Sequence, residues 1–440
     1  MEYLSSNKIA IIDLGTKEIV EEELDQDLVK EHIGGAGITT ALFEKYKEGE
    51  PVVLGTGLLT GTLVPGSALG IMTAQSPRTG TLCHAPLTLY AGMELKYSGF
   101  DYLVIKGRSQ QPVYLWLHDG IADLEPAEGL WGKNVWEALE SVRKTVGDDL
   151  VQALVIGRAG EQGSDLAQVS INYWASGDRW GFGKLLGEKK VKLIAIRGMG
   201  LLEISDPEGL VNRCQELLKT VKQGSWKGKQ GIADLLIALG EGDAKEWLGP
   251  LVHRHKSCFN TPYATNTFVF IDEDPTLLKE TDQEEPGFLL TDLYGLLGFK
   301  KLGLSAADAC RVLKECAKEG LDAAAVSAIC AQSGLKDWNG IQKALPGMKG
   351  PAVSSGDGPF SAWAPPQPIL ADFGPAADGS RQASWWRRRQ ALAYLFGIHP
   401  IFALMAPEFG EGELLELANL GTGLGFIQDC LDKAISRLVG

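Results

Sequence analysis

The pattern of apolar residues changes at Asp206-Pro207, and this change constrains the fold more than any other feature. Before it, short runs rich in β-branched residues, such as KIAIIDL and PVYLWL, are separated by tight turns, as is typical of strands. After it, segments such as GLVNRCQELLKTVKQ have the spacing of helices, and Pro207 suits a first helical turn. We therefore predict an α+β protein with a β-rich N-terminal half and a mostly helical C-terminal half.

Composition and turn signals divide the chain further. In the first half, Asp119-Gly120 favours a hairpin turn, and helices are predicted chiefly around 25–46 and 133–147. A later segment rich in Pro and Gly favours a long loop. The predicted organisation is a β-rich domain at 1–205, a helical domain at 206–349, a Pro/Gly-rich linker at 350–381 and a C-terminal helical segment at 382–440.

Charge and composition exclude several classes of protein. The chain has 440 residues, 45% of them apolar, and a net charge of −14, which argues against nucleic acid and anionic membranes as partners. The start, MEYLSSNKIAIIDL, lacks the apolar core of a signal peptide, and no stretch is long enough for a membrane helix. Seven cysteines without a C-x-x-C pair indicate buried thiols. We expect a cytoplasmic protein.

Glycine is over-represented, with 54 residues, and three glycine-rich segments stand out. HIGGAGI follows a helical pattern and GTGLLTGT lacks the Lys-Ser/Thr of a P-loop, so neither predicts a nucleotide site. The third is RWGFGKLLGEKK, in which backbone N–H groups near Gly181 and Gly183, with Arg179 and Lys189, could bind an anion. The alternative is a tight turn into a helix whose glycines serve packing.

One local group of soft ligands occurs, in the sequence HRHKSC. His253, His255 and Cys258 could contact a metal, but no matching second half lies nearby. The acidic pair Glu284-Glu285 lies in a charged run, which is typical of a solvated surface.

Several motifs occur in a characteristic order over about 200 residues. They are IIDLGTKEIVEEEL, HIGGAGI, GLLTGT, SPRTG, ELKYSGFDYLVIKG, LWG, IGRAGEQ and the R-x-G-x-G-x3-G-x-K segment followed by VKLIAIRG. Together they resemble the aldehyde ferredoxin oxidoreductase family. The resemblance implies an N-terminal domain of two β-sheets that supports two pterins and one tungsten, covered by helical domains. It also implies oxidation of an aldehyde and water to a carboxylic acid, with two electrons passed through a 4Fe-4S cluster to ferredoxin.

The resemblance also identifies the positions that correspond to the cluster ligands. The family motif C-x2-C-x3-C aligns with Cys258, Thr261 and Thr265, and Pro262 supports this register. The distant fourth ligand aligns with His399. Thr hydroxyls are poor iron ligands, so we expect Cys258 and His399 to be remnants of a cluster site and the 4Fe-4S cluster to be absent.

The pterin-binding positions are partly retained. The family motif D-x-x-G-L corresponds to Asp292, Gly295 and Leu296, and the third glycine-rich segment retains Arg179, Gly181, Gly183, Gly187 and Lys189. The second copy of that motif has Tyr394 in place of Asp. Leu89-Tyr90 replaces a Gly-Gly pair, and Glu188 replaces a Ser. Side chains at 89 and 90 would obstruct a close backbone approach, and Glu188 would repel a phosphate.

These observations favour a shortened, divergent family member that has lost the cluster and family catalysis, acting as a non-catalytic or accessory subunit. The alternative is an active oxidoreductase with a tungsten or molybdenum pterin and altered electron transfer. A metal-binding module built on His253, His255 and Cys258 is a third hypothesis. The expected partners are a second copy of the chain or an active family paralogue, with ferredoxin only if the chain is active.

Overall fold

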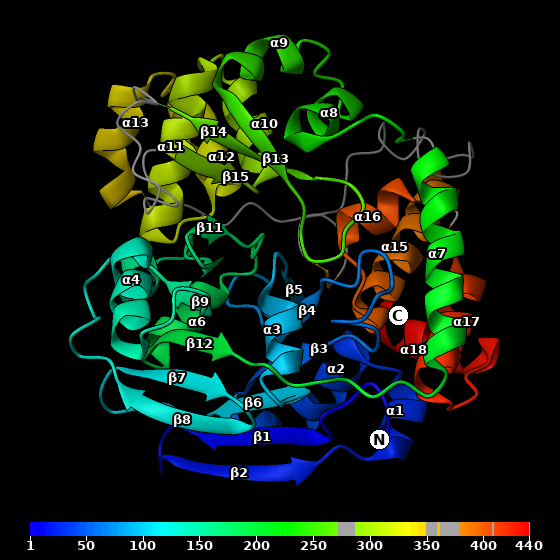
Figure 1. Cartoon of the computed structure of the whole chain (residues 1–440). Coiled ribbons are helices and arrows are strands. Elements are labelled where there is room, and N and C mark those ends of the chain that lie inside the picture. The colour runs from blue at the N-terminus through cyan, green and yellow to red at the C-terminus, as the bar shows by residue number, and fades with distance from the viewer. Residues whose placement is uncertain (225, 272–286, 349–358, 361–378, 407–408, 440) are drawn as a thin grey trace.

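Two six-stranded sheets form the N-terminal half of the computed structural model (Figure 1). The structure describes residues 1–440 except 225, 272–286, 349–358, 361–378, 407–408 and 440. In order across the first sheet are β2 (Glu18–Glu23), β1 (Lys8–Asp13), β6 (Tyr102–Lys106), β3 (Val52–Thr56), β4 (Gly70–Gln75) and β5 (Leu82–Leu87). In order across the second are β11 (Trp174–Ala175), β10 (Val169–Ile171), β9 (Gln152–Ile156), β12 (Val191–Arg197), β7 (Val113–His118) and β8 (Ile121–Pro126).

Both sheets are mixed. The pairs β1–β6 and β7–β12 are parallel, and the other neighbouring strands in the two sheets run antiparallel. The predicted turn at Asp119-Gly120 is confirmed, since His118 pairs with Ile121 and both turn residues have positive φ, 46° and 80°. The domain of two β-sheets that the family resemblance implies is confirmed.

Short helices accompany these sheets. They are α1 (Gln26–His32), α2 (Gly35–Lys45), η1 (Lys47–Gly49), α3 (Ala91–Tyr97), α4 (Val135–Val146), α5 (Arg158–Glu161) and α6 (Phe182–Glu188). Helix α4 begins at a capping box between Asn134 and Glu137 and ends at Gly147 with φ 78°, so its limits follow from local sequence. The helices predicted around 25–46 and 133–147 are confirmed, the first of them as two helices separated at Ile33-Gly34.

The following region is mostly helical. Helix α7 (Pro207–Gln223) begins where Asp206 accepts a hydrogen bond from the Gly209 N–H. The other helices are α8 (Gly231–Ala238), α9 (Ala244–Leu248), η2 (Gly249–Leu251), α10 (Leu293–Lys301), α11 (Ala306–Glu319), α12 (Ala323–Ser333), α13 (Trp338–Ala344) and η4 (Leu345–Gly347). An additional small antiparallel sheet consists of β13 (Val252–Lys256), β14 (Asn266–Phe270) and β15 (Gly287–Leu290). The sequence analysis did not predict this sheet.

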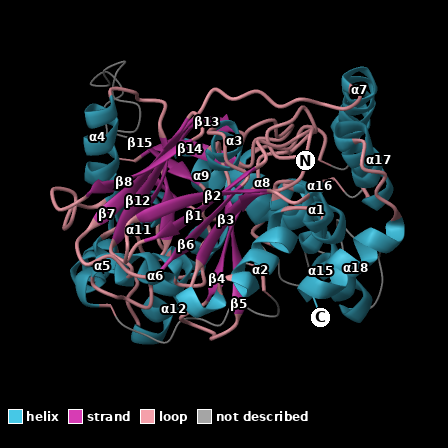
Figure 2. Cartoon of the chain, turned by 90° about the horizontal axis from the view of Figure 1, so that it is seen from below, coloured by secondary structure: helices cyan, strands magenta, loops and turns pink. Residues whose placement is uncertain are grey.

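The C-terminal helices return to the N-terminal half. They are α15 (Gly379–Phe396), α16 (Pro400–Met405), α17 (Glu411–Thr422) and α18 (Gln428–Val439). Helix α15 contacts α2, α18 contacts α1, and α17 contacts α7, as Figures 1 and 2 allow the reader to follow. Most of the predicted linker at 350–381, like Glu284-Glu285, lies outside the described residues. Among the helices that the structure describes, none has the length and apolarity needed to cross a membrane.

Candidate functional site

Buried charged side chains gather where the N-terminal sheets meet the helical region above them in Figure 1. Arg78 Nη1 lies 2.8 Å from Asp322 Oδ2, and Arg179 Nη2 lies 3.1 Å from Asp292 Oδ1. Arg78 also donates to the carbonyl oxygens of Asp165 and Arg179, at 2.6 and 2.7 Å. Two ion pairs thus connect the two parts of the chain.

Both aspartates also begin helices. Asp292 Oδ1 accepts a hydrogen bond from the Gly295 N–H at 2.8 Å and caps α10, and Asp322 caps α12 in the same way. Burial raises the pKa of Asp292, although Arg179 opposes the shift. Burial also acts to raise the pKa of Asp322, but Arg78 and Arg179 outweigh it, so this pKa is lowered. The ionised form of Asp322 is therefore the better stabilised of the two.

A third buried carboxylate, Asp178, organises the turn before α6. It accepts hydrogen bonds from the backbone N–H groups of Val169, Trp180 and Gly183, at 3.0, 2.9 and 3.3 Å. Burial raises the pKa of Asp178 to about 6, although Arg78 opposes this shift. Asp178 therefore fixes the backbone conformation around Arg179.

The segment predicted as an anion site surrounds α6, and the glycines within this helix contact the protein's own backbone. A Cβ at Gly183 would lie 2.4 Å from the Gln168 carbonyl oxygen, and one at Gly187 would lie 2.0 Å from that of Gly160. Gly181, at φ 81°, forms the N-cap of the helix. These contacts favour the packing interpretation of the glycines.

The two cations of that predicted site lie at opposite ends of α6. Arg179 precedes the helix, whereas Lys189 follows it and donates to the Gly107 carbonyl oxygen at 3.0 Å. In this structure the two side chains have separate partners, since Arg179 pairs with Asp292. Burial lowers the pKa of Lys189 to about 8, which weakens it further as a permanent cation.

The retained D-x-x-G-L residues have local structural roles. A Cβ at Gly295 would lie 2.8 Å from the Ala323 Cβ, so glycine permits α10 to approach α12. Leu296 is fully buried in the core, and Asp292 caps α10 as described. All three residues therefore have structural roles in capping and packing.

Two of the segments that align with cluster ligands meet at Gly66. The Gly66 N–H donates to the Asn260 carbonyl oxygen at 2.7 Å, and the Gly66 carbonyl accepts from the His399 N–H at 2.7 Å. The loop that carries Cys258 and Thr261 therefore lies on one side of Gly66 and His399 on the other. Gly66 thus joins the two distant segments.

The donor groups at these positions are one thiol, two hydroxyls and one imidazole. Burial raises the pKa of Cys258 to about 11 and lowers that of His399 to about 4, so both groups are neutral at pH 7. His399 Nδ1 accepts from the Phe402 N–H at 3.4 Å and caps α16. A 4Fe-4S cluster is held by four thiolates, and this donor set does not fit it.

The metal module suggested by the HRHKSC segment is contradicted by the geometry. The His253 ring packs on Phe270 with centroids 4.4 Å apart, and His255 Nδ1 lies 3.1 Å from Thr267 Oγ1. Within the described ranges, which include His253, His255 and Cys258, no group of three or more His, Cys, Asp and Glu could hold a metal. Both histidines instead support the small sheet.

Aromatic packing fills the position of the second D-x-x-G-L motif. Tyr394 is fully buried, and its ring centroid lies 4.8 Å from that of Phe360 and 6.4 Å from that of His84. A Cβ at Gly35 would lie 1.8 Å from the Tyr394 carbonyl oxygen, so the glycines of HIGGAGI permit contact between α2 and α15. Burial lowers the pKa of His84 to about 3, so no positive charge is available there.

Leu89 has a backbone conformation that favours glycine. Its φ is 57°, and its side chain is buried. Its carbonyl accepts from the Phe259 N–H at 2.9 Å, next to Cys258, and the rings of Tyr90 and Phe259 lie 6.5 Å apart. The predicted Gly-Gly position thus retains a turn suited to glycine but carries a large apolar side chain.

Comparisons with known proteins agree with this arrangement. Residues 9–198 match the family described as "Aldehyde ferredoxin oxidoreductase, N-terminal domain". The N-terminal domain of the chain is therefore of the aldehyde ferredoxin oxidoreductase type. It is 32% identical over 246 residues to a tungsten-containing aldehyde ferredoxin oxidoreductase of Pyrococcus abyssi, covering 53% of this chain and 40% of that protein. It is 28% identical over 241 residues to an aliphatic sulfonate oxidoreductase, WOR-like subunit, of Pyrococcus furiosus, covering 49% of this chain and 38% of that protein.

The matches span about two fifths of the length of these curated family members. A solved structure of similar fold is the active site complex BamBC of benzoyl coenzyme A reductase in complex with 1,5-dienoyl-CoA. Its TM-score is 0.65 at 20% identity, covering 94% of this chain and 64% of that chain. This similarity extends the common fold from the N-terminal domain to almost the whole chain.

The residues at the family's cofactor base do not fit two anionic pterins. Arg179 pairs with Asp292, Lys189 binds a backbone carbonyl, and Tyr394 occupies an aromatic cluster. Arg78, Asp178 and Asp322 also belong to the charged cluster but were not predicted from the sequence. Arg78 stands within the quoted SPRTG motif, whereas the two aspartates have no signal in the sequence that distinguishes them from ordinary caps and turns.

Proposed function

We propose that this protein is a degenerate member of the aldehyde ferredoxin oxidoreductase family that retains the fold, lacks the 4Fe-4S site and acts as a non-catalytic or accessory subunit. The observation that carries the proposal is the donor set around Gly66. Cys258 and His399 are both buried and neutral, and the two remaining positions, Thr261 and Thr265, offer hydroxyls. Electron transfer through a cubane cluster has no thiolate set to support it here.

The pterin positions support the same proposal. The ion pair between Arg179 and Asp292 uses side chains that could otherwise face a ligand. Leu89 and Tyr394 place large apolar or aromatic groups where the family has a glycine and an aspartate. These changes lie on separate elements, so compensating for all of them would require several independent adjustments.

The proposed partner is an active paralogue of the family, and a homodimer is the alternative assembly. The WOR-like relative is named as a subunit, and the solved structure of similar fold is named as a complex.

We also infer a cytoplasmic location. The seven cysteines all fall within the described residues and are free thiols, which is common in a reducing compartment.

A second function is an active pterin-dependent oxidoreductase with altered electron transfer. The retention of Arg179 and Asp292 favours it, because the resemblance assigns both positions to pterin-binding motifs. A tungsten or molybdenum pterin is the cofactor this alternative requires.

Metal content distinguishes the two functions. The full chain is purified anaerobically from a host that makes the pterin cofactor, and iron, tungsten and molybdenum are measured per folded chain. We expect no more than trace amounts of all three metals. About four irons per chain with a brown colour would contradict the loss of the cluster. Stoichiometric tungsten or molybdenum would contradict the degenerate function even without iron.

The assembly is tested separately. The tagged chain is co-expressed with a family member that has the complete cysteine motif, and the mass of the purified species is measured by light scattering. A stable heteromeric complex is expected, whereas a homodimer in the presence of that member would contradict the paralogue partner.

A further inference from the structure

A cavity of about 650 Å³ lies between the N-terminal domain and the helical region, and the proposed function does not use it. One side is formed by the start of α5 and the loop that follows the helix, and the other by α11, α13 and η4. This volume is within the usual range for small-molecule sites, and boundaries between domains are a common place for them.

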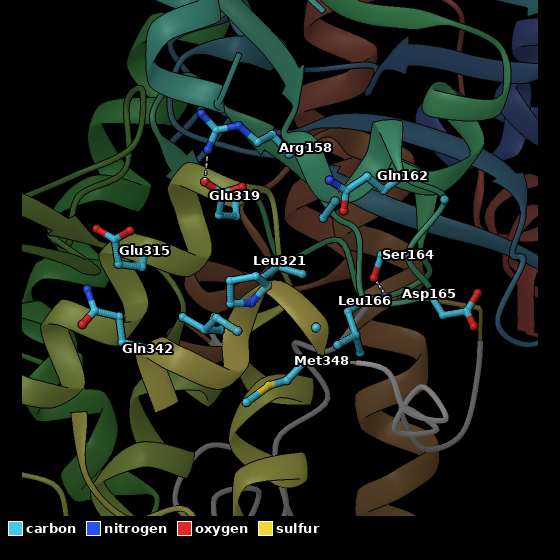
Figure 3. A pocket seen from close by; sticks show the side chains of 15 residues that line it. Arg158, Gln162, Ser164, Asp165, Leu166, Glu315, Glu319, Leu321, Gln342 and Met348 are labelled. Atoms are coloured by element: carbon cyan, nitrogen blue, oxygen red, sulfur yellow. Dashed lines mark hydrogen bonds and ion pairs between the residues drawn. The ribbon is translucent and has the colours of Figure 1, made fainter. Parts of the chain in front are cut away.

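The side chains in the cavity are arranged as an apolar centre between polar groups (Figure 3). Leu321, Leu166 and Met348 lie in the middle of the view. Glu315 lies to one side of them and Asp165 to the other. A ligand that fills this space therefore needs an apolar body with a polar group at its end.

The charges of the lining residues determine which charge is favoured on the polar group of the ligand. Among the lining residues that the structure describes, one side chain is basic, Arg158, and three are acidic, namely Asp165, Glu315 and Glu319. Arg158 Nη1 lies 2.5 Å from Glu319 Oε1, and Asp165 Oδ1 lies 2.7 Å from Lys184 Nζ. Glu315 has a weaker ion pair, at 3.7 Å from Lys318 Nζ. Its carboxylate is the least neutralised of the lining charges within the described residues.

We propose that this cavity binds a small organic cation, an amine with an aromatic or branched apolar body. The apolar body lies on Leu321 and Met348, and the ammonium group faces Glu315. Excess negative charge in a partly enclosed site favours cations and disfavours carboxylates and phosphates of the same shape. The site therefore differs in ligand class from the anionic cofactors of the family.

The test uses three probes of similar size that differ in charge: 2-phenylethylamine, 2-phenylethanol and 3-phenylpropanoate. Their affinities for the full chain are measured by ligand-observed NMR titration. We expect the amine to bind about fivefold more tightly than the alcohol, the difference that one partly exposed ion pair supplies, and the carboxylate to bind most weakly. Equal affinities or a preference for the carboxylate would overturn the proposal.

Two variants locate the site. Glu315→Gln should remove the preference for the amine over the alcohol, while Glu216→Gln, on α7 outside the cavity, should leave it unchanged. Gln342→Trp alters an exposed lining residue and should abolish binding of the amine by filling the cavity. Amine binding that survives Gln342→Trp, or a preference that survives Glu315→Gln, would overturn the proposal.

Discussion

The guanidinium of Arg179 lies 3.1 Å from the carboxylate of Asp292, although the two residues are 113 positions apart in the chain. Arg179 extends from the turn that Asp178 organises, and Asp292 begins α10. The guanidinium also lies 4.7 Å from the Tyr294 ring centroid, a cation–π contact. Motif residues from the two halves therefore bind each other and hold the halves together.

Removal of Arg179 should destabilise the protein. Arg179→Met leaves the buried Asp292 carboxylate without its partner, and we expect the free energy of unfolding to fall by about 3 kcal/mol at pH 7. Urea unfolding followed by circular dichroism measures this change. Adding Asp292→Ser, which preserves the helix cap, should recover part of the loss.

Arg213→Met is the matched control for this experiment. Its ion pair with Glu416, at 2.7 Å, is substantially more exposed, so its loss should cost less than about 1 kcal/mol. Equal effects of the two substitutions would contradict a buried pair at the junction.

Asp178 should make stability depend on pH between about 4 and 6. Burial raises its folded pKa to about 6 from an ordinary value of 3.8, so the folded state binds the proton more tightly than the unfolded state. Its contribution is fully present below pH 3.8 and is lost as the pH rises through 6, a change of up to about 3 kcal/mol. The Asn side chain of Asp178→Asn cannot titrate. The unfolding free energy of the unchanged protein minus that of the variant should therefore decrease as the pH rises over this range. A constant difference from pH 4 to 7 would contradict the raised pKa.

Much of the fold could be predicted because its signals are local. The Asp119-Gly120 turn, the cap at Asp206 and the change of periodicity at Pro207 need only neighbouring residues. The small sheet could not be predicted in the same way. Its outer strand, β13, carries His253 and His255, which resemble metal ligands in sequence. This strand is stabilised by pairing with β14, and only the tertiary structure defines where β14 lies.

The candidate site was harder to predict because its residues come from distant segments. The resemblance aligns Cys258 and His399 as cluster positions, and in the structure Asn260, two residues after Cys258, and His399 both bind Gly66. The sequence does not indicate that Gly183 and Gly187 face backbone carbonyls, or that Arg78 pairs with Asp322. Such contacts depend on how the two halves of the chain pack.

At Leu89, substitution by glycine should cost less stability than substitution by alanine, the reverse of the usual order. Its φ of 57° is unfavourable for any residue with a Cβ, so Leu89→Gly should be more stable than Leu89→Ala by about 1 kcal/mol. Urea unfolding of both variants measures the difference. Leu87, which is buried in β5, serves as the control. Within a strand, Leu87→Gly should be less stable than Leu87→Ala. The same order at both positions would contradict the left-handed conformation of Leu89.

Restoring the cysteines should restore iron binding if the alignment around Gly66 is correct. The triple variant Thr261→Cys, Thr265→Cys and His399→Cys would place four thiols where Cys258 now stands alone, and Thr265 already lies against the Cys258 thiol. After anaerobic reconstitution we expect about four irons per chain and a brown chromophore. Adding Cys258→Ser should abolish the chromophore while circular dichroism stays unchanged. A folded triple variant that takes up no iron would show that these positions do not form one site, because His399 would then be only the cap of α16 and Cys258 only a buried thiol.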